Sequence, residues 1–406
     1  MSCATPSEWE DVFTGCPACP TEGANEPIEV VYTDELGPGR STDRDVALSL
    51  LATRRQPIVA ESRIELGRPQ TTPLPALRSL GENLYAKNET LNPTWGHKDR
   101  LHEIDAGVAR LLRCRGVVAT STGNHGAAAA AYASAAGLPS VIFCHPDASA
   151  SALRMITAYG GRPVHLPKDE VHGAVANMVD SGWFPATSMD PLISGRSNPF
   201  GAEGYKVIAY EVAAQLGECP GTVIVPTASG DTYYGIAKGF AEVAALFDEA
   251  PVRVVAAQPT EADSLVQSAK EGRLVRIEAP HSLALSIAEP VTGRQALHAV
   301  TRWDGATIAV DEEDIIDATR DLALCGLLVE PASAAALAAY WALRERGLSN
   351  ERPTVLVLTG AGVKWPGAMS AVFPGEPLTG FGELGTYLAD LEARGFALPA
   401  AGKSRR

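Results

Sequence analysis

The stretch Val117-Val118-Ala119-Thr120-Ser121-Thr122-Gly123-Asn124-His125-Gly126 joins a short apolar run to an alanine-rich segment. The branched residues at its start predict a buried β-strand, and the alanines that follow predict a helix over 126–136. The small polar residues between them form a loop at a helix N-terminus, where free amides and the helix dipole attract anions. A ligand carboxylate could bind this loop, although the same residues could also simply cap the helix.

The same alternation of strand, loop and helix extends through most of the chain. Apolar runs that predict strands lie at 28–32, 84–87, 117–120, 141–144, 222–225, 252–257, 307–310 and 354–358. Segments that predict helices lie at 43–53, 98–114, 126–136, 151–159, 234–247, 312–324, 333–344 and 382–394. Short Val/Ile-rich strands that alternate with helices are typical of βαβ units. We therefore expect an α/β fold with mostly parallel sheets flanked by helices.

A second loop, Asn92-Pro93-Thr94-Trp95-Gly96-His97-Lys98-Asp99-Arg100, leads directly into the predicted helix at 98–114. The positive end of the helix dipole and partial burial both lower the pKa of a lysine in this position. A neutral amine is the form that attacks an aldehyde, so Lys98 is a candidate nucleophile. The alternative is an ordinary surface lysine at a helix start.

Two further loops of small residues follow predicted strands. Pro226-Thr227-Ala228-Ser229-Gly230-Asp231-Thr232 could present backbone N–H groups to a phosphate, and it is not a Walker loop because no Gly-Lys-Ser/Thr follows. Leu358-Thr359-Gly360-Ala361-Gly362-Val363-Lys364 ends another apolar strand and offers the neutral hydroxyl of Thr359. Ligands bind beyond the carboxyl ends of parallel strands. Together, the four loops predict one site for an amine, a carboxylate and a phosphate.

The overall charge and the hydropathy pattern argue against several classes of function. The chain has 34 basic and 48 acidic residues, a formal net charge of −14. A nucleic-acid-binding surface needs a basic footprint, and anionic membranes attract basic segments, so we expect no nucleic acid and no membrane as partners. No apolar run reaches the ~18 residues of a membrane helix, and we identify no signal peptide. The chain has seven cysteines, an odd number that cannot all pair within one chain. Together these features predict a cytoplasmic protein with free thiols.

The N-terminal segment contains one Cys-x-x-Cys pair, Cys16 and Cys19, with Cys3 upstream. Structural zinc usually takes four ligands, often from two such pairs. A second pair and a nearby histidine are both missing. We therefore expect no metal site and interpret the pair as a plain loop or the remnant of a zinc knuckle.

In order and spacing, these motifs resemble the fold-type II enzymes that use pyridoxal 5′-phosphate, the tryptophan-synthase-β-like group. The nearest likeness is to threonine synthases, and it covers about residues 64 to 370. Other segments that carry it are Glu203-Gly204-Tyr205-Lys206, Ala209-Tyr210-Glu211, Gly235-Ile236-Ala237-Lys238-Gly239-Phe240 and Glu330-Pro331-Ala332-Ser333-Ala334. The agreement of several independent segments makes the resemblance specific.

The resemblance implies a role for each loop, with a small-molecule amino acid as the substrate. Lys98 would form the Schiff base with the cofactor and shuttle the α-proton. Asn124 would hydrogen-bond the cofactor's 3′-oxygen, and Thr359 would face the pyridine nitrogen, where a neutral hydroxyl suits elimination and replacement rather than transamination. The residues implied to bind the cofactor phosphate are Ala228, Ser229, Gly230, Asp231 and Thr232. Those implied to contact substrate are Ser121, Thr122, Gly123, His125, His97 and Arg100.

Two departures from the family pattern bear on the substrate. Gly96-His97 stands where the family usually has Ser-Phe, so the His97 ring either packs there or serves as a proton relay or substrate contact. His125-Gly126 after the asparagine is closer to serine and threonine dehydratases. The candidates to hold a leaving phosphate are Lys206, Arg100, Arg154 and Lys238.

The resemblance therefore implies a lyase or synthase that eliminates a leaving group from Cβ or Cγ of an amino acid. The candidate reaction converts O-phosphohomoserine and water to threonine and phosphate. A serine/threonine dehydratase or a β-replacement enzyme is the alternative with the same cofactor. The alternative of another class is a non-catalytic protein that binds the cofactor or an amino acid.

The resemblance also implies two α/β lobes with the cofactor between them. We expect an N-terminal extension over 1–60, a large cofactor-binding lobe over 61–105 and 201–373, and a small lobe over 106–200. A C-terminal helix and tail would occupy 374–406. A homodimer is expected from the family likeness and from the frequency of twofold oligomers.

Overall fold

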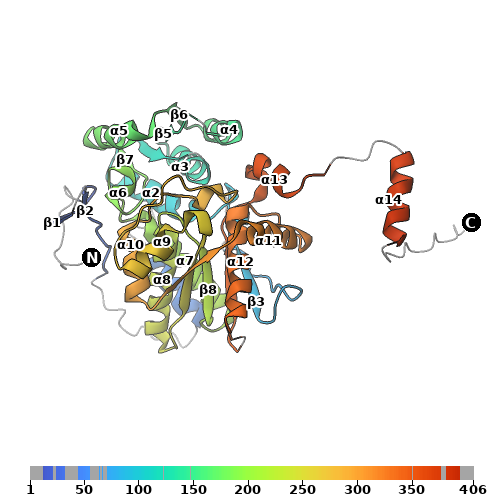
Figure 1. The fold of residues 1–406 in the computed structure, drawn as a ribbon. Coiled ribbons are helices and arrows are strands. Elements are labelled where there is room, and N and C mark those ends of the chain that lie inside the picture. The colour runs from blue at the N-terminus through green and yellow to red at the C-terminus, as the bar shows by residue number, and fades with distance from the viewer. Residues whose placement is uncertain are drawn as a thin grey trace, which may run out of the picture.

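Two separate sheets form the core of the molecule, each with helices packed on it (Figure 1). The computed structural model describes residues 12–21, 24–32, 44–54, 64, 66, 71–121, 123–146, 148–349, 351–375 and 381–393. All strand pairs within these two sheets are parallel. The predicted α/β fold with mostly parallel sheets is thus confirmed.

The larger sheet consists of β3 (Leu84–Asn88), β8 (Thr222–Pro226), β9 (Arg253–Pro259), β10 (Ala306–Val310) and β11 (Thr354–Leu358). Its strand order is β10-β9-β8-β11-β3. Side chains alternate between its two faces: Val223 and Val355 belong to one core, whereas Ile224 and Leu356 belong to the other. Because helices cover both faces, these strands are continuous apolar runs in the sequence.

The helices of the large lobe divide between the two faces of the sheet. The first core includes residues of α1 (Arg44–Arg54), α7 (Gly201–Leu216), α8 (Asp231–Phe247), α9 (Ser264–Glu271) and α10 (Arg294–Arg302). The second core includes residues of α11 (Glu312–Leu324) and α12 (Pro331–Glu345). Gly235 lets α7 and α8 approach closely, since a Cβ there would lie 2.4 Å from the carbonyl oxygen of Ala202.

The smaller sheet consists of β4 (Val117–Thr120), β5 (Ser140–Cys144), β6 (Arg162–His165) and β7 (Phe184–Pro185), in the order β6-β5-β4-β7. Three helices contact its strands, namely α3 (Asn124–Ala135), α4 (Ala150–Ala158) and α5 (Lys168–Asp180). The helix α2 (Lys98–Leu111) packs against α3 of this lobe and α7 of the other. It therefore carries Lys98 at the junction of the two lobes.

The N-terminal part differs from its prediction. Residues 28–32 form no strand. Instead, β1 (Cys16–Thr21) and β2 (Ala24–Glu26) form an antiparallel hairpin. Within residues 28–32, Val30 packs on the core of the small lobe, and its carbonyl oxygen accepts a hydrogen bond from Lys238. These contacts hold the segment in place without a neighbouring strand. Cys16 and Cys19 both lie on β1, and Cys3 lies outside the described residues.

The remaining helices are α6 (Pro191–Ser194), α13 (Pro366–Val372) and α14 (Phe381–Ala393). Figure 1 shows α14 standing apart from the two lobes. In the described part of the chain, no helix combines the length and the apolarity that crossing a bilayer requires. Among the same residues, no three His, Cys, Asp or Glu side chains gather as a set of metal ligands.

Candidate active site

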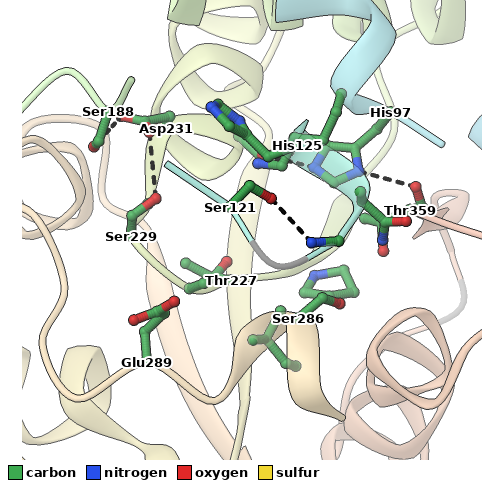
Figure 2. A pocket seen from close by; sticks show the side chains of 18 of the residues that line it. His97, Ser121, His125, Ser188, Thr227, Ser229, Asp231, Ser286, Glu289 and Thr359 are labelled. Carbon is green, nitrogen blue, oxygen red and sulfur yellow. Dashed lines mark hydrogen bonds between the residues drawn. The ribbon is translucent and has the colours of Figure 1, made fainter. Parts of the chain in front are cut away.

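One cavity of about 180 Å³ is lined by residues from all four predicted loops (Figure 2). The loops meet because β3, β4, β8 and β11 end at the same edges of their parallel sheets. The predicted residues that line the cavity are His97, Lys98, Ser121, Gly123, Asn124, His125, Ala228, Ser229, Gly230, Asp231, Thr232 and Thr359. Thr122 lies outside the described residues.

Lys98 is the first residue of α2, and its amine is available for chemistry. The side chain is half-buried, and no hydrogen-bond or ion-pair partner lies near it among the described residues. Its Nζ lies 5.6 Å from the centre of the Tyr205 ring. Burial lowers the pKa of this amine, although the carboxylates of Asp231, Glu330 and Glu289 partly oppose the change. A larger fraction of Lys98 is therefore neutral than for a lysine in water.

The loop between β8 and α8 forms an anion cradle. Gly230 caps α8 with φ +100°, a conformation that L-residues rarely adopt, and a Cβ there would lie 2.2 Å from the Cβ of Ala296. The backbone N–H groups of Ser229 and Gly230 have no acceptor within the described chain. Free amides at the start of the 17-residue α8 provide the donors that a phosphate needs.

The carboxylate of Asp231 is held by donors from both lobes. Its Oδ1 accepts from Ser188 Oγ and the Met189 amide at 3.1 Å, and from Gln295 Nε2 at 2.8 Å. Its Oδ2 accepts from Ser229 Oγ at 3.3 Å. Burial raises the pKa of Asp231, and Lys98 and these hydrogen bonds oppose the rise. Asp231 is therefore engaged in joining the lobes as well as in lining the cavity.

Asn124 opens α3 and faces the buried carboxylate of Glu330. Its Nδ2 donates to both oxygens of Glu330 at 2.9 Å, while its Oδ1 is buried without a partner. Ser286 Oγ donates to the same carboxylate at 3.1 Å. Burial raises the pKa of Glu330, although these hydrogen bonds oppose the rise. Of the two polar atoms of the Asn124 amide, Oδ1 is therefore the one that can still accept a hydrogen bond.

His97 connects two of the loops. Its Nδ1 lies 2.9 Å from the carbonyl oxygen of Thr359, so Nδ1 carries the proton and donates. Its Nε2 lies 3.0 Å from Thr232 Oγ1 and accepts from that hydroxyl. Burial and the nearby Lys98 hold the pKa of His97 well below its ordinary value. His97 is thus a neutral, hydrogen-bonded bridge rather than a ring that only fills the space of a phenylalanine.

Thr359 presents a neutral hydroxyl to the cavity. Its Oγ1 lies 2.9 Å from Ser333 Oγ on α12. Ser333 also contacts both backbone groups of Gly360, at 2.8 Å and 3.0 Å. Ser333 was named only as part of a family segment, and its contact with Thr359 was not predicted, because 26 residues separate the two.

His125 lines the cavity and contacts a buried histidine behind the cavity wall. Its Nε2 donates to the carbonyl oxygen of Ala186 at 2.8 Å, and its ring lies 4.4 Å from that of His102. His102 Nδ1 in turn lies 3.0 Å from Asp105 Oδ2. Burial, His102 and Lys98 keep the pKa of His125 well below its ordinary value, so His125 is neutral. His102 and Asp105 share one face of α2 and were not identified from the sequence.

The prediction that Arg100 contacts substrate requires correction, because Arg100 does not line the cavity. Its guanidinium is buried, with Nε 2.9 Å from Glu89 and Nη1 2.5 Å from Glu211. Nη2 also donates to Thr72 at 3.1 Å. Every nitrogen of the side chain is therefore used inside the large lobe, in a cluster completed by Lys87, whose Nζ lies 2.6 Å from Glu211.

The other candidates for binding a leaving phosphate also lie outside the cavity. Lys206 and Lys238 are buried and each forms an ion pair with Glu203 at 2.7 Å. Arg154 is exposed on α4. Among the described lining residues, Lys98 is consequently the one lysine or arginine.

Some lining residues lie outside the four loops. They are Thr120, Ser188, Ile193, Ser194, Leu285, Ser286, Ile287, Glu289 and Trp365. The indole of Trp365 packs on the asparagine loop, since a Cβ on Gly123 would lie 2.6 Å from its Cζ2. Residues 285–289 follow no predicted strand, so no local signal pointed to them.

Comparison with known proteins adds an independent finding. Residues 65–360 match the family described as pyridoxal-phosphate dependent enzyme. Threonine synthase from Methanocaldococcus jannaschii is 30% identical over 328 residues, which cover 77% of this chain and 79% of that protein. Threonine synthase from Bacillus sp. (strain ULM1) is 29% identical over 294 residues, which cover 71% and 80%.

Solved structures agree with the fold. A threonine deaminase from T.th. is 26% identical, has a TM-score of 0.60, and covers 71% of this chain and 92% of its own. The processed form of threonine deaminase isoform 2 from Solanum lycopersicum is 21% identical with a TM-score of 0.67 and covers 86% and 97%. At that lower identity, the likeness supports the two-lobed fold alone.

Proposed function

Because this chain belongs to the family of pyridoxal-phosphate dependent enzymes, we propose that it is an amino-acid lyase in which Lys98 holds the cofactor and removes the substrate α-proton. When bound, the cofactor supplies an electron sink that makes the α-carbon acidic. The observation that carries the proposal is the position of the Lys98 amine in a cavity lined by two loops suited to anions.

The residues of the cavity fit the cofactor. The acceptor-free amides of Ser229 and Gly230 suit its phosphate, and Asn124 has a buried amide with an unused Oδ1. Thr359 offers a neutral hydroxyl for the pyridine nitrogen. A neutral partner leaves that nitrogen unprotonated, which favours elimination over transamination.

The substrate would be held and deprotonated by residues of both lobes. Its carboxylate would bind the loop at Ser121 and Gly123, next to the N-terminus of α3. Lys98, with its lowered pKa, would take the α-proton. The uncharged rings of His97 and His125 would exclude water on that side without adding a positive charge.

We favour elimination of a Cβ substituent that carries no phosphate. A leaving phosphate needs a cationic partner, yet Arg100, Lys206 and Lys238 are committed to buried carboxylates. The neutral histidines supply no charge either. This distribution supports a dehydratase-like reaction on serine, threonine or a related amino acid, with a 2-oxoacid as the product.

Threonine synthesis from O-phosphohomoserine is the second candidate, and the 30% identity to threonine synthase favours it. The purified enzyme, loaded with cofactor, would be given O-phosphohomoserine in one assay and serine or threonine in another. We expect 2-oxoacid from serine or threonine. Phosphate release matched by threonine formation would support the second candidate instead, and bound cofactor without any turnover would indicate a binding protein.

We further propose that the enzyme acts in the cytoplasm as a homodimer, on a small amino acid alone. The net charge of −14 gives no support to nucleic-acid or anionic membrane partners. Sedimentation equilibrium of the full chain tests the assembly. A single species with the monomer mass of 42.6 kDa at all concentrations would refute the dimer.

A further inference from the structure

Glu289 is a charged lining residue that the chemistry above does not use. It lies between the short 3₁₀ turn Leu285–Ile287 and α10, and Figure 2 shows its side chain at the cavity with Thr227 and Ser229. No donor among the described residues lies within hydrogen-bonding distance of its carboxylate. The side chain is accessible, so a ligand can reach it.

The other charges around the cavity already have partners or a role. Asp231 accepts four hydrogen bonds, and Glu330 accepts from Asn124 and Ser286. Lys98 is reserved for the cofactor and the α-proton. Glu289 is therefore the one unpaired charge left for the distal end of a substrate, among the described lining residues.

An unpaired carboxylate beside a reacting group favours a cation and disfavours an anion. A charge-assisted hydrogen bond is short and roughly twice as strong as a neutral one. A phosphate or carboxylate placed beside Glu289 would instead meet a like charge. Although the Glu289 side chain is open to the cavity, the surrounding walls limit its hydration and raise its pKa, and Lys168 and Lys98 partly oppose this rise.

Resting on the lyase function proposed above, we propose that Glu289 selects amino acids with a second, cationic amino group on Cβ, of which 2,3-diaminopropionate is the simplest. In this reaction the Cα–H bond breaks and its proton passes to Lys98, while the Cα–H electrons form the Cα–Cβ double bond. The Cβ–N bond breaks and its electron pair leaves with ammonia. Water then hydrolyses the released aminoacrylate to pyruvate and a second ammonia, so no oxidant or reductant is needed.

A neighbouring cavity of about 390 Å³ provides the competing possibility. It shares Ile193 and Glu289 with the first cavity and is also lined by Lys168 and Arg276. An anionic substrate tail could reach these cations, but only past the carboxylate of Glu289, which lines both cavities. We therefore favour the cationic substrate and treat anion binding by Lys168 as the outcome that would overturn the proposal.

The test compares three substrates that differ in the charge of the Cβ substituent. Holoenzyme would be assayed for pyruvate from 2,3-diaminopropionate, serine and O-phosphoserine. We expect kcat/KM to be highest for the diamine. Glu289→Gln should lower the ratio of kcat/KM for the diamine to that for serine by about 10- to 100-fold, as expected for one charge-assisted hydrogen bond. Glu289→Asp, which keeps the charge, should preserve the preference in part.

Asp169→Asn is the matched control, because it removes a carboxylate that lines only the neighbouring cavity. It should leave the ratio unchanged. Turnover of serine with no preference for the diamine, and no change in Glu289→Gln, would refute this inference while leaving the lyase function intact. A preference for O-phosphoserine that Lys168→Met removes would refute it as well.

Binding measurements separate this inference from the proposed function. If holoenzyme turns over none of these three substrates and neither threonine nor O-phosphohomoserine, the lyase proposal fails. The absorbance of the bound cofactor would then be titrated with the diamine and with serine, in wild type and in Glu289→Gln. Weaker binding of the diamine alone in the variant supports the role of Glu289, and equal binding in both proteins refutes it.

Discussion

Lys98 is the residue on which the proposed chemistry depends, and its removal has a defined outcome. Lys98→Ala should abolish the visible absorbance of the lysine-bound cofactor and lower turnover by roughly 10²–10⁴-fold or more, because the general base is lost as well. The measurement is an absorbance spectrum with initial rates. Lys270→Ala is the control, since this exposed lysine on α9 lines neither cavity. A yellow, active Lys98→Ala protein would end the assignment.

Gly230 is the second residue whose replacement gives a clear expectation. Gly230→Ala would place a Cβ 2.2 Å from that of Ala296 at φ +100°, so the cradle must move. Strain of this kind costs of order 1–3 kcal/mol, and cofactor affinity should fall by about tenfold or more. The affinity is measured by titrating the cofactor-free protein with pyridoxal phosphate and following its fluorescence.

Gly272→Ala is the matched control for this change. Gly272 also has positive φ, +68°, but a Cβ there would meet nothing within 4 Å, and the residue is remote from the cavity lining. It should cost some stability and leave cofactor affinity unchanged. Equal affinity losses in the two variants would show that the cradle geometry is not responsible.

Residue by residue, the sequence located the loops but not the partners of their side chains. Lys98, Asn124 and Thr359 could be proposed because small residues after apolar strands mark the carboxyl edge of a sheet. Arg100 was assigned wrongly because its carboxylates, Glu89 and Glu211, come from a different strand end and a different helix. For charges far apart in the sequence, spacing does not show which of them meet in the fold.

At the scale of elements, β3, α2 and α7 are fixed to one another by the buried cluster of Lys87, Glu89, Arg100 and Glu211. Burial alone would raise the pKa of Glu89, but Arg100 and Lys87 lower it to about 2. A carboxyl with a lowered native pKa stabilises the fold above its ordinary value near 4.5 and loses this contribution as the pH falls toward 2. Acidification should therefore weaken the packing of β3, α2 and α7 against one another.

Glu89→Gln tests this linkage. The variant should unfold more easily at pH 7 by about 3–5 kcal/mol, because Arg100 loses part of its buried compensation. Because the variant has no Glu89 carboxyl to protonate, its free energy of unfolding should also fall less than that of wild type between pH 4.5 and 2. Denaturant unfolding across this pH range measures both, with exposed Glu82→Gln as the control. Identical pH profiles in wild type and variant would contradict the assignment.

The elements themselves could be predicted where the sequence pattern has one interpretation. β4 and α11 have the predicted bounds, since a branched apolar run and a 3.6-residue period are unambiguous there. α7 was not predicted as a helix, because Gly201 and Gly204 weaken its helical propensity while allowing close packing on α2. The β1–β2 hairpin was missed because Cys-Pro-Ala-Cys-Pro is typical of a loop.

At the scale of the whole molecule, Arg294 holds several parts together. From α10 it donates to Asp190, the cap of α6, at 2.8 Å and to the carbonyl oxygen of Asn25 in the hairpin, also at 2.8 Å. Asp190 is fully buried, and Arg294 is its cationic partner. Arg294 therefore ties the N-terminal hairpin and the segment beside the small lobe to the large lobe.

Arg294→Met should loosen the two lobes relative to each other. Breaking a buried pair on one side costs about 3–5 kcal/mol, and the small sheet should lose more amide protection than the large one. Hydrogen exchange of β4 and β5 against β8 and β11 measures this difference. Arg320→Met, which breaks an exposed pair with Asp317, is the control. Uniform loss of protection in both sheets would argue against a linking role.

The indole of Trp365, packed on Gly123 at the cavity wall, is also an intrinsic fluorescent reporter of cofactor binding. Pyridoxal phosphate absorbs light at wavelengths where tryptophan emits, so a cofactor bound in this cavity would quench the emission of this ring by energy transfer. Emission would dim as empty protein is loaded and brighten again on release. Occupancy could thus be followed in real time, without a label and without any knowledge of the substrate.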